Sequence, residues 1–187
     1  MRGLIHIYCG DGKGKTTASI GLLVRAVGNH IPVVFAQFMK NDTSSEIEII
    51  RTMPDTVVLH AKKHFGFYHK MSADEKEEAR IEYTATFIEA VNIAKEKALL
   101  RQNKEERLNN GLTLLILDEI LSAYNYNLID NVMLVELLQH KPDNLEIVLT
   151  GRNPKVELIE LADYVSEIQK RKHPFDKGIT ARKGIEK

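Results

Sequence analysis

The sequence predicts an α/β protein with a mostly parallel sheet and helices on both faces. Short unbroken apolar runs alternate along the chain with segments whose apolar residues recur at helical spacing. The first apolar run ends in a glycine-rich turn that leads directly into a helical segment. Unbroken apolar strands and strand–helix alternation are typical of parallel sheets buried on both faces. Ligands of such sheets bind at the carboxyl ends of the strands.

The bulk composition narrows the class of protein. A chain of 187 residues with 43% hydrophobic content can bury a full core, so we expect one domain over residues 1–187. Acidic and basic residues balance at 26 each, which disfavours nucleic acid as a partner. The single cysteine, the absence of a leader-like pattern and the absence of a membrane-length apolar run favour the cytoplasm and no membrane partner. We expect small molecules or proteins as partners.

The first half of the chain contains a βαβ unit and a basic, aromatic loop. Gly28-Asn29 is a plausible helix stop, and Lys62–Lys70 interleaves basic and aromatic residues, which makes it a candidate for ligand contact. The predicted elements are strands over Leu4–Cys9, Pro32–Phe38 and Thr56–Leu59 and helices over Thr17–Val27 and Glu46–Arg51.

The second half of the chain continues the alternation of predicted strands and helices. Ser72 and Glu75 form a capping box before a long helix, and Asp130 is a possible cap of a later one. The apolar stripe expected for the long helix is Ile81, Ala85, Ile88, Val91, Ala94 and Ala98. After a polar break over Gln102–Gly111, we expect strands over Leu112–Leu117, Leu145–Thr150 and Tyr164–Ile168 and helices over Asp130–His140 and Val156–Ala162.

The segment Cys9–Thr17 has the features of a phosphate-binding loop. A loop that leaves a strand and enters a helix directs backbone N–H groups at its centre, and glycines let a phosphate approach closely. Lys15 can reach the phosphates, and the Thr16 hydroxyl can coordinate Mg²⁺. Cys9 stands where the strict motif has glycine, and we interpret it as a small buried residue rather than a reactive thiol. The expected nucleotide-binding residues are Gly10, Asp11, Gly12, Lys13, Gly14, Lys15, Thr16 and Thr17.

Two further groups of residues are candidates for this site. Asp118 and Glu119 end a buried strand, where they could be a helix cap and a surface acid. Beside a phosphate loop they indicate a magnesium site, one carboxylate holding the metal and the other able to orient a water if ATP is hydrolysed. Arg25 and Arg152 could each pair with phosphate oxygens, the alternative being solvated arginines. Arg152 is favoured because it follows a strand end.

Read from end to end, the sequence resembles the bacterial ATP:corrinoid adenosyltransferases of the P-loop class. The resemblance covers nearly the whole chain. Each matching segment alone is weak evidence, and their combination in this order is what makes the resemblance specific. It implies the P-loop NTPase (RecA-like) architecture. The matching segments, in chain order, are Gly10–Thr17 with its non-glycine entry residue, Arg25–Gly28, Val34–Lys40, Gly66-Phe67, Leu117–Glu119, Tyr124–Tyr126, Thr150–Arg152, Leu161–Asp163 and His173–Gly178.

The resemblance implies a reaction and roles for particular residues. The family transfers the 5′-deoxyadenosyl group of ATP to the cobalt of a reduced corrinoid and releases triphosphate. It implies catalytic roles for Lys15 and Arg152, which balance the triphosphate charge, and for Phe67, which lies against the corrinoid. Thr16 and Glu119, with Asp118, would serve Mg²⁺. It further implies an external reductant such as a flavoprotein, and a homodimer.

His69 is a departure from the family pattern. The family often has tryptophan two residues beyond the phenylalanine of this loop, whereas here His69 is able to ligate cobalt or donate a hydrogen bond. Ligation by His69 would oppose the four-coordinate state that eases reduction of Co(II). We therefore expect His69 to be near the corrinoid and a neighbour, Phe65 or Tyr68, to share the role of the missing tryptophan.

Two other functions use the same loop. A P-loop ATPase or small-molecule kinase would let water or a hydroxyl attack the γ-phosphate. A nucleotide-gated module that binds a corrinoid without chemistry is the second alternative.

Overall fold

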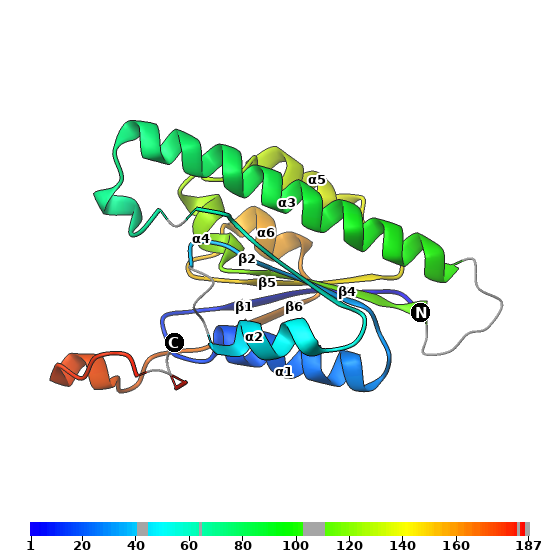
Figure 1. Ribbon diagram of the computed structural model, residues 1–187, viewed down its shortest axis with the longest axis horizontal. Coiled ribbons are helices and arrows are strands. Elements are labelled where there is room, and N and C mark those ends of the chain that lie inside the picture. Colours follow the sequence, from blue (N-terminus) through cyan, green and yellow to red (C-terminus); the bar gives the residue numbers. More distant parts are fainter. Residues whose placement is uncertain (41–44, 64, 103–110, 183, 186–187) are drawn as a thin grey trace.

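The computed structural model describes residues 1–40, 45–63, 65–102, 111–182 and 184–185. Its centre is a six-stranded sheet in which every pair of neighbouring strands is parallel (Figure 1). The strand order is β3-β2-β4-β5-β1-β6. The strands are β1 (Ile5–Cys9), β2 (Val33–Gln37), β3 (Thr56–His60), β4 (Thr113–Asp118), β5 (Leu145–Thr150) and β6 (Tyr164–Glu167). The predicted α/β class with a parallel sheet is confirmed.

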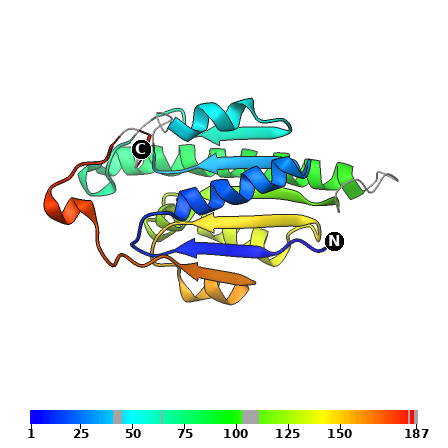
Figure 2. The ribbon, with the colours of Figure 1, turned by 90° about the horizontal axis from the view of Figure 1, so that it is seen from below.

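Helices cover both faces of the sheet, as predicted. One face carries α1 (Lys15–Gly28) and α2 (Ser45–Thr52), which Figure 2 shows from their own side. The opposite face carries α3 (Ala73–Gln102), α4 (Ile120–Asn125), α5 (Asn131–Gln139) and α6 (Val156–Leu161) (Figure 1). The described residues also include the 3₁₀ turns η1 (Tyr68–Lys70) and η3 (Pro174–Lys177). Within the described ranges, no helix is both long and apolar enough to cross a membrane.

The central strands are apolar throughout because each of their faces has a core of its own. On β2, Val33 and Phe35 pack with α1 and α2 residues such as Leu23, whereas Val34 and Ala36 belong to the core under the helices of the other face. Alternate side chains of a strand point to opposite faces, so burial on both sides produces an unbroken apolar run.

Local sequence signals set several helix ends. The Ser72 N–H donates to Glu75 Oε2 at 2.8 Å and the Glu75 N–H donates to Ser72 Oγ at 3.2 Å, which is the predicted capping box. The Asp130 side chain accepts from the Val132 and Met133 N–H groups, as expected of a cap. Because these signals act over three residues, sequence alone locates them.

Two sequence predictions about the helices were wrong. The expected stripe of α3 is confirmed at Val91, Ala94 and Ala98, which are buried, but it is wrong in the first half of the helix, where Ile81 is 62% exposed and the core receives Tyr83 and Phe87 instead. Tyr83 packs edge-on against Phe38 and Phe65, and this aromatic contact sets the rotation of the helix. The short helix α4, directly after β4, was not predicted because six residues are too few to show a helical period. Most of the expected polar break, residues 103–110, lies outside the described residues.

A matched pair of phenylalanine variants tests this core. Phe35 is fully buried and Phe67 is 77% exposed. We expect Phe35→Ala to lower the free energy of unfolding by about 3–5 kcal/mol, the range for truncating a buried phenylalanine. Phe67→Ala should change it by less than about 0.5 kcal/mol, as is usual at the surface. Urea unfolding followed by circular dichroism measures both, and equal losses would contradict the described packing.

Candidate functional site

The loop Gly10–Gly14 connects β1 to α1 at the carboxyl edge of the sheet. Gly14 is the N-cap of α1 and offers no side-chain hydrogen bond to the first turn, so those backbone N–H groups are not capped by a side chain. Such a helix start attracts anions. Cys9 is buried at the strand end, as predicted, and burial, helped by the charge of Glu167, raises the pKa of its thiol.

The chain that follows β6 lies directly against this loop. The Gly12 N–H donates to the Ile168 carbonyl at 2.8 Å, and the Ile168 N–H donates to the Cys9 carbonyl at 2.8 Å. A Cβ atom at position 12 would lie 2.7 Å from the Ile168 oxygen, and one at position 10 would lie even closer. The packing of the protein itself therefore requires glycine at positions 10 and 12. The sequence gives no signal of this contact.

Asp118 lies at the centre of a network of side-chain hydrogen bonds. It is fully buried and accepts four side-chain hydrogen bonds. Its Oδ1 accepts from Thr150 Oγ1 at 2.6 Å and from Thr16 Oγ1 at 2.9 Å. Its Oδ2 accepts from Gln37 Nε2 and from Lys40 Nζ, both at 3.0 Å. The four donors come from β5, α1, β2 and the segment after β2, so the carboxylate joins these elements at one point.

These contacts determine the charge of Asp118. Burial by itself raises the pKa of the carboxyl group, but the positive charge of Lys40 and the hydrogen bonds from Thr150, Gln37 and Lys40 outweigh burial and lower it. Asp118 is therefore a carboxylate at neutral pH. Beside the Thr16 hydroxyl it provides the hard oxygen ligands that Mg²⁺ prefers.

Glu119 is held beside Asp118 by its backbone and its side chain. It has a left-handed conformation with φ 62°, and its N–H donates to Thr150 Oγ1 at 2.8 Å. Ser122 Oγ donates to Glu119 Oε1 at 2.6 Å. The structure thus brings together the three residues predicted for a metal, Thr16, Asp118 and Glu119.

The charges of Lys40 and Arg152 act on Lys15, beside the loop. Lys15 Nζ donates to the Gly12 carbonyl at 2.9 Å. Burial is the largest cause that lowers the pKa of Lys15; Glu119 opposes it, and the positive charges of Arg152 and Lys40 reinforce it. An anion bound beside these cationic side chains would offset the repulsion between them.

The loop carrying Arg152 is fixed by α4. Asn125 Nδ2 donates to the carbonyls of Arg152 and Asn153, both at 3.0 Å. Gly151 has φ 145° and lies so close to Leu121 that a Cβ would be 2.7 Å from the leucine Cβ. The helix that sequence reasoning missed is therefore the element that positions the predicted arginine.

Arg25 is a predicted site residue that lies away from the start of α1. It lies in the last turn of α1, ten residues after Lys15. At a rise of about 1.5 Å per residue, this places it about 15 Å further along the helix axis. Its charge instead acts on Tyr8, whose pKa is raised by burial and by Glu146 and lowered by Arg25.

The aromatic loop after β3 separates its side chains into two groups. Phe67 is 77% exposed, whereas Phe65 is buried at 8% exposure and packs edge-on against Tyr83. Tyr68 stacks on Tyr126 with ring centroids 4.1 Å apart. His69 is exposed, with its ring centroid 5.9 Å from that of Tyr126. Of the two proposed neighbours of Phe67, Phe65 belongs to the core and Tyr68 lies nearer the surface.

Three residues of the site were quoted in the sequence but given no role: Gln37, Lys40 and Thr150. They meet at the site because parallel strands end at one edge and β2 and β5 are the neighbours of β4. Gln37 is in register with Asp118. Strand order was the missing information, and it cannot be read from one sequence.

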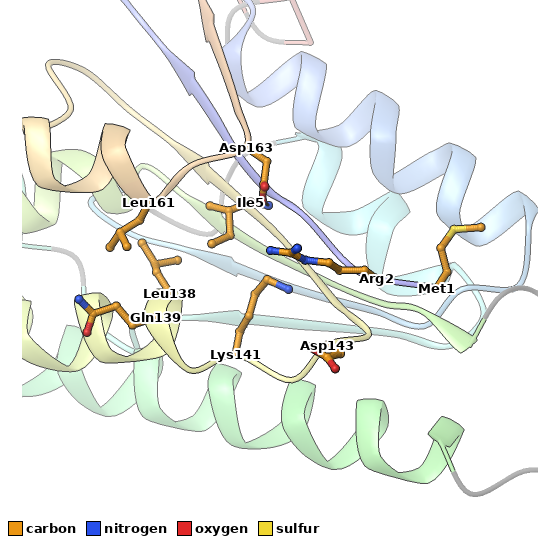
Figure 3. Close-up of a pocket in the computed structure, with 9 residues that line it drawn as sticks. All are labelled: Met1, Arg2, Ile5, Leu138, Gln139, Lys141, Asp143, Leu161 and Asp163. Carbon is orange, nitrogen blue, oxygen red and sulfur yellow. Dashed lines mark hydrogen bonds between the residues drawn. The ribbon is translucent and has the colours of Figure 1, made fainter.

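A separate cavity of about 690 Å³ lies at the amino ends of the strands (Figure 3). Ile5, at the start of β1, and Asp163, just before β6, line it together with Arg2 and Lys141. Lys141 Nζ donates to the Gly3 carbonyl at 2.6 Å. This cavity is at the edge opposite to the phosphate loop and does not belong to the site.

The parallel sheet, the loop between β1 and α1 and the buried Asp118 two strands away define a protein of the P-loop NTPase class. The chain belongs to the family described as ATP:corrinoid adenosyltransferase BtuR/CobO/CobP, whose profile matches residues 1–186.

Known proteins agree with this membership. The chain is 36% identical to a corrinoid adenosyltransferase of Sinorhizobium sp., over 99% of this chain and 80% of the relative. It is 30% identical to the corrinoid adenosyltransferase of Escherichia coli K12, over 99% of this chain and 86% of the relative. A solved structure of EssC (ATPases 2 and 3) from Geobacillus thermodenitrificans matches 87% of this chain and 32% of that chain, with a TM-score of 0.51 and 15% identity, and shows the fold alone.

A pair of substitutions at Thr150 tests the network around Asp118. Thr150→Val removes the hydroxyl that donates to Asp118 and accepts from the Glu119 N–H. We expect a loss of about 1.5–3 kcal/mol of unfolding free energy, the range for hydrogen bonds to charged groups. Thr150→Ser keeps the hydroxyl and should retain most of the stability. Guanidinium unfolding measures the difference, and equal stability of the valine and serine variants would contradict the assigned role.

Proposed function

We propose that this chain transfers the 5′-deoxyadenosyl group of ATP to the Co(I) centre of a reduced corrinoid and releases triphosphate. The observation that carries the proposal is the site at the carboxyl edge of the sheet, within a chain that matches the family over residues 1–186. There a cationic phosphate loop follows β1 and the exposed Phe67 lies in the loop that follows β3.

The chemistry requires no general base. Co(I) supplies the electron pair for the new Co–C5′ bond, and the C5′–O5′ bonding pair leaves with the triphosphate, so no proton is transferred. The protein must align the two reactants and stabilise the departing anion. Lys15, Arg152 and the uncapped N–H groups of α1 are suited to the second task. ATP would lie with its triphosphate in the loop and its ribose C5′ accessible to cobalt.

Magnesium fits the oxygen ligands of the site. Thr16 and the ionised Asp118 would hold it, with Glu119 fixed beside them by Ser122. When bound, the metal supplies positive charge to the phosphate oxygens. The residues themselves bind and orient the triphosphate.

The aromatic loop is suited to one face of the corrinoid. Phe67 is exposed, and Tyr68 is held in place by its stack on Tyr126. Apolar closure of that face would favour loss of the lower axial ligand and so ease reduction of Co(II). His69 would stand at the edge of this surface and not replace the missing tryptophan directly.

We further propose where the enzyme acts, its oligomeric state and its electron donor. A cytoplasmic location agrees with the single buried cysteine. The homodimer and an external reductant such as a flavoprotein are proposed from the family to which the chain belongs. Nucleic acid and membrane are not expected partners.

The products of the reaction distinguish adenosyl transfer from the alternatives. Triphosphate formed only in the presence of reduced corrinoid supports transfer. Release of ADP without corrinoid would instead indicate an ATPase or kinase. Tight corrinoid binding with no adenosylation under strong reduction would indicate a binding module.

Substitution of Lys15 tests the placement of the triphosphate. We expect Lys15→Ala to lower the rate of triphosphate release by at least about 100-fold, as for removal of a group that stabilises charge in the transition state. Lys95→Ala, on the exposed side of α3, is the control and should leave the rate unchanged. Anion chromatography of triphosphate measures both, and an unchanged rate in Lys15→Ala would reject the placement.

Substitution of Phe67 tests its role in reduction. Phe67→Ala should slow adenosylation more when the reaction starts from Co(II) than when it starts from prereduced Co(I), because apolar closure aids the loss of the axial ligand. Phe67→Leu keeps an apolar side chain and should therefore lose less of the adenosylation rate from Co(II) than Phe67→Ala. Absorbance of the adenosylated corrinoid gives both rates. Equal losses from the two starting states would argue against a role in reduction.

A further inference from the structure

We propose that Lys40 is a tethered cation that holds the metal position of the nucleotide-free protein and transfers to the triphosphate when Mg²⁺ and ATP bind. The inference rests on the proposed function and concerns how the site admits its metal. It makes Lys40 a positioning residue that couples metal entry to nucleotide entry.

The first argument is the position of the Lys40 ammonium group. Lys40 Nζ lies 2.9 Å from Thr16 Oγ1 and 3.0 Å from Asp118 Oδ2. These are the oxygen atoms of the two residues that would hold Mg²⁺. The Lys40 side chain is only 32% exposed and Asp118 is fully buried, so little water screens the pair.

The backbone after β2 directs Lys40 to this place. The Phe38 N–H donates to the Asp118 carbonyl at 2.9 Å, which anchors the end of β2 to the end of β4. Met39 then has a positive φ of 55°, which turns the chain immediately before Lys40. The contact is therefore built by the fold rather than by a freely moving surface lysine.

The ammonium group and a metal ion cannot share these oxygens. Mg²⁺ binds its ligands at about 2.0–2.1 Å and requires near-octahedral geometry. An ion placed that close to Thr16 Oγ1 and Asp118 would meet the Lys40 ammonium within a few ångströms. Two like charges at such a distance in a poorly solvated site repel strongly. Lys40 must leave before the metal can enter.

The triphosphate gives Lys40 another partner. The charges of Lys40 and Arg152 both act on Lys15, so the three side chains border the same space, where the described acidic groups that act on Lys15 are Glu119 and Asp11. A triphosphate in the loop would accept hydrogen bonds from the flexible lysine stem and free Thr16 and Asp118 for the metal. Because coupling between ligands is reciprocal, ATP should strengthen metal binding and metal should strengthen ATP binding.

The test is metal binding without nucleotide. Mn²⁺, which has a paramagnetic signal, is titrated into the nucleotide-free wild type, Lys40→Gln, Lys40→Arg and the control Lys95→Gln. Glutamine can still donate to Asp118 but carries no charge. We expect Lys40→Gln to bind Mn²⁺ at least about tenfold more tightly than the wild type, within the usual range of such couplings. Lys40→Arg and Lys95→Gln should resemble the wild type.

Equal Mn²⁺ affinity of folded wild type and folded Lys40→Gln would overturn the inference. If Lys40→Gln does not fold, a crystal structure of the wild type with Mg²⁺ and ATP decides instead. There Lys40 should contact a phosphate oxygen, and a lysine still bonded to Thr16 and Asp118 would overturn the proposal. These outcomes are separate from the enzyme's reaction, because a wild type that forms no adenosylated corrinoid would contradict the proposed function whatever its Mn²⁺ affinity.

Discussion

A buried carboxylate governs the geometry of this protein. Removing the charge of Asp118 from water costs several kcal/mol, and the cost is offset only when opposite charge and hydrogen-bond donors surround it. Those donors come from α1, β2, β5 and the turn after β2. A displacement of any one element would remove one of these four donors from the buried charge. The start of α1 is therefore fixed relative to the end of β4, although β5 lies between β1 and β4.

The same arrangement prepares the site for a polyanion. Lys40 and Arg152 lie close enough to Lys15 for their charges to act on it, and hydrogen bonds to the Gly12 carbonyl and to Asp118 hold the two lysines in place before any ligand binds. Charge that is positioned in advance does not have to reorganise during reaction. For a transfer in which triphosphate is the leaving group, this is the main task of the polypeptide. The aromatic loop performs the other task, which is contact with the second substrate.

Local signals made much of the fold predictable from sequence. Unbroken apolar runs identified the strands, and side chains within three residues of a helix start identified the caps at Ser72 and Asp130. The glycine-rich turn between an apolar run and a helix identified the phosphate loop. These features depend on neighbours in the chain, so one sequence is enough to find them. The buried face in the first half of α3 was predicted wrongly because Tyr83 packs against Phe38 and Phe65, which are distant in sequence.

The sequence by itself determined the α/β class, the phosphate loop and the acidic strand end, because each is written in consecutive residues. Tertiary structure alone decided that Lys40 and Thr150 meet Asp118, that the chain after β6 packs on Gly12, and that Arg25 stays at the far end of α1. The physical reason is strand order. Parallel strands place their carboxyl ends side by side, but which strands become neighbours depends on the packing of the whole sheet.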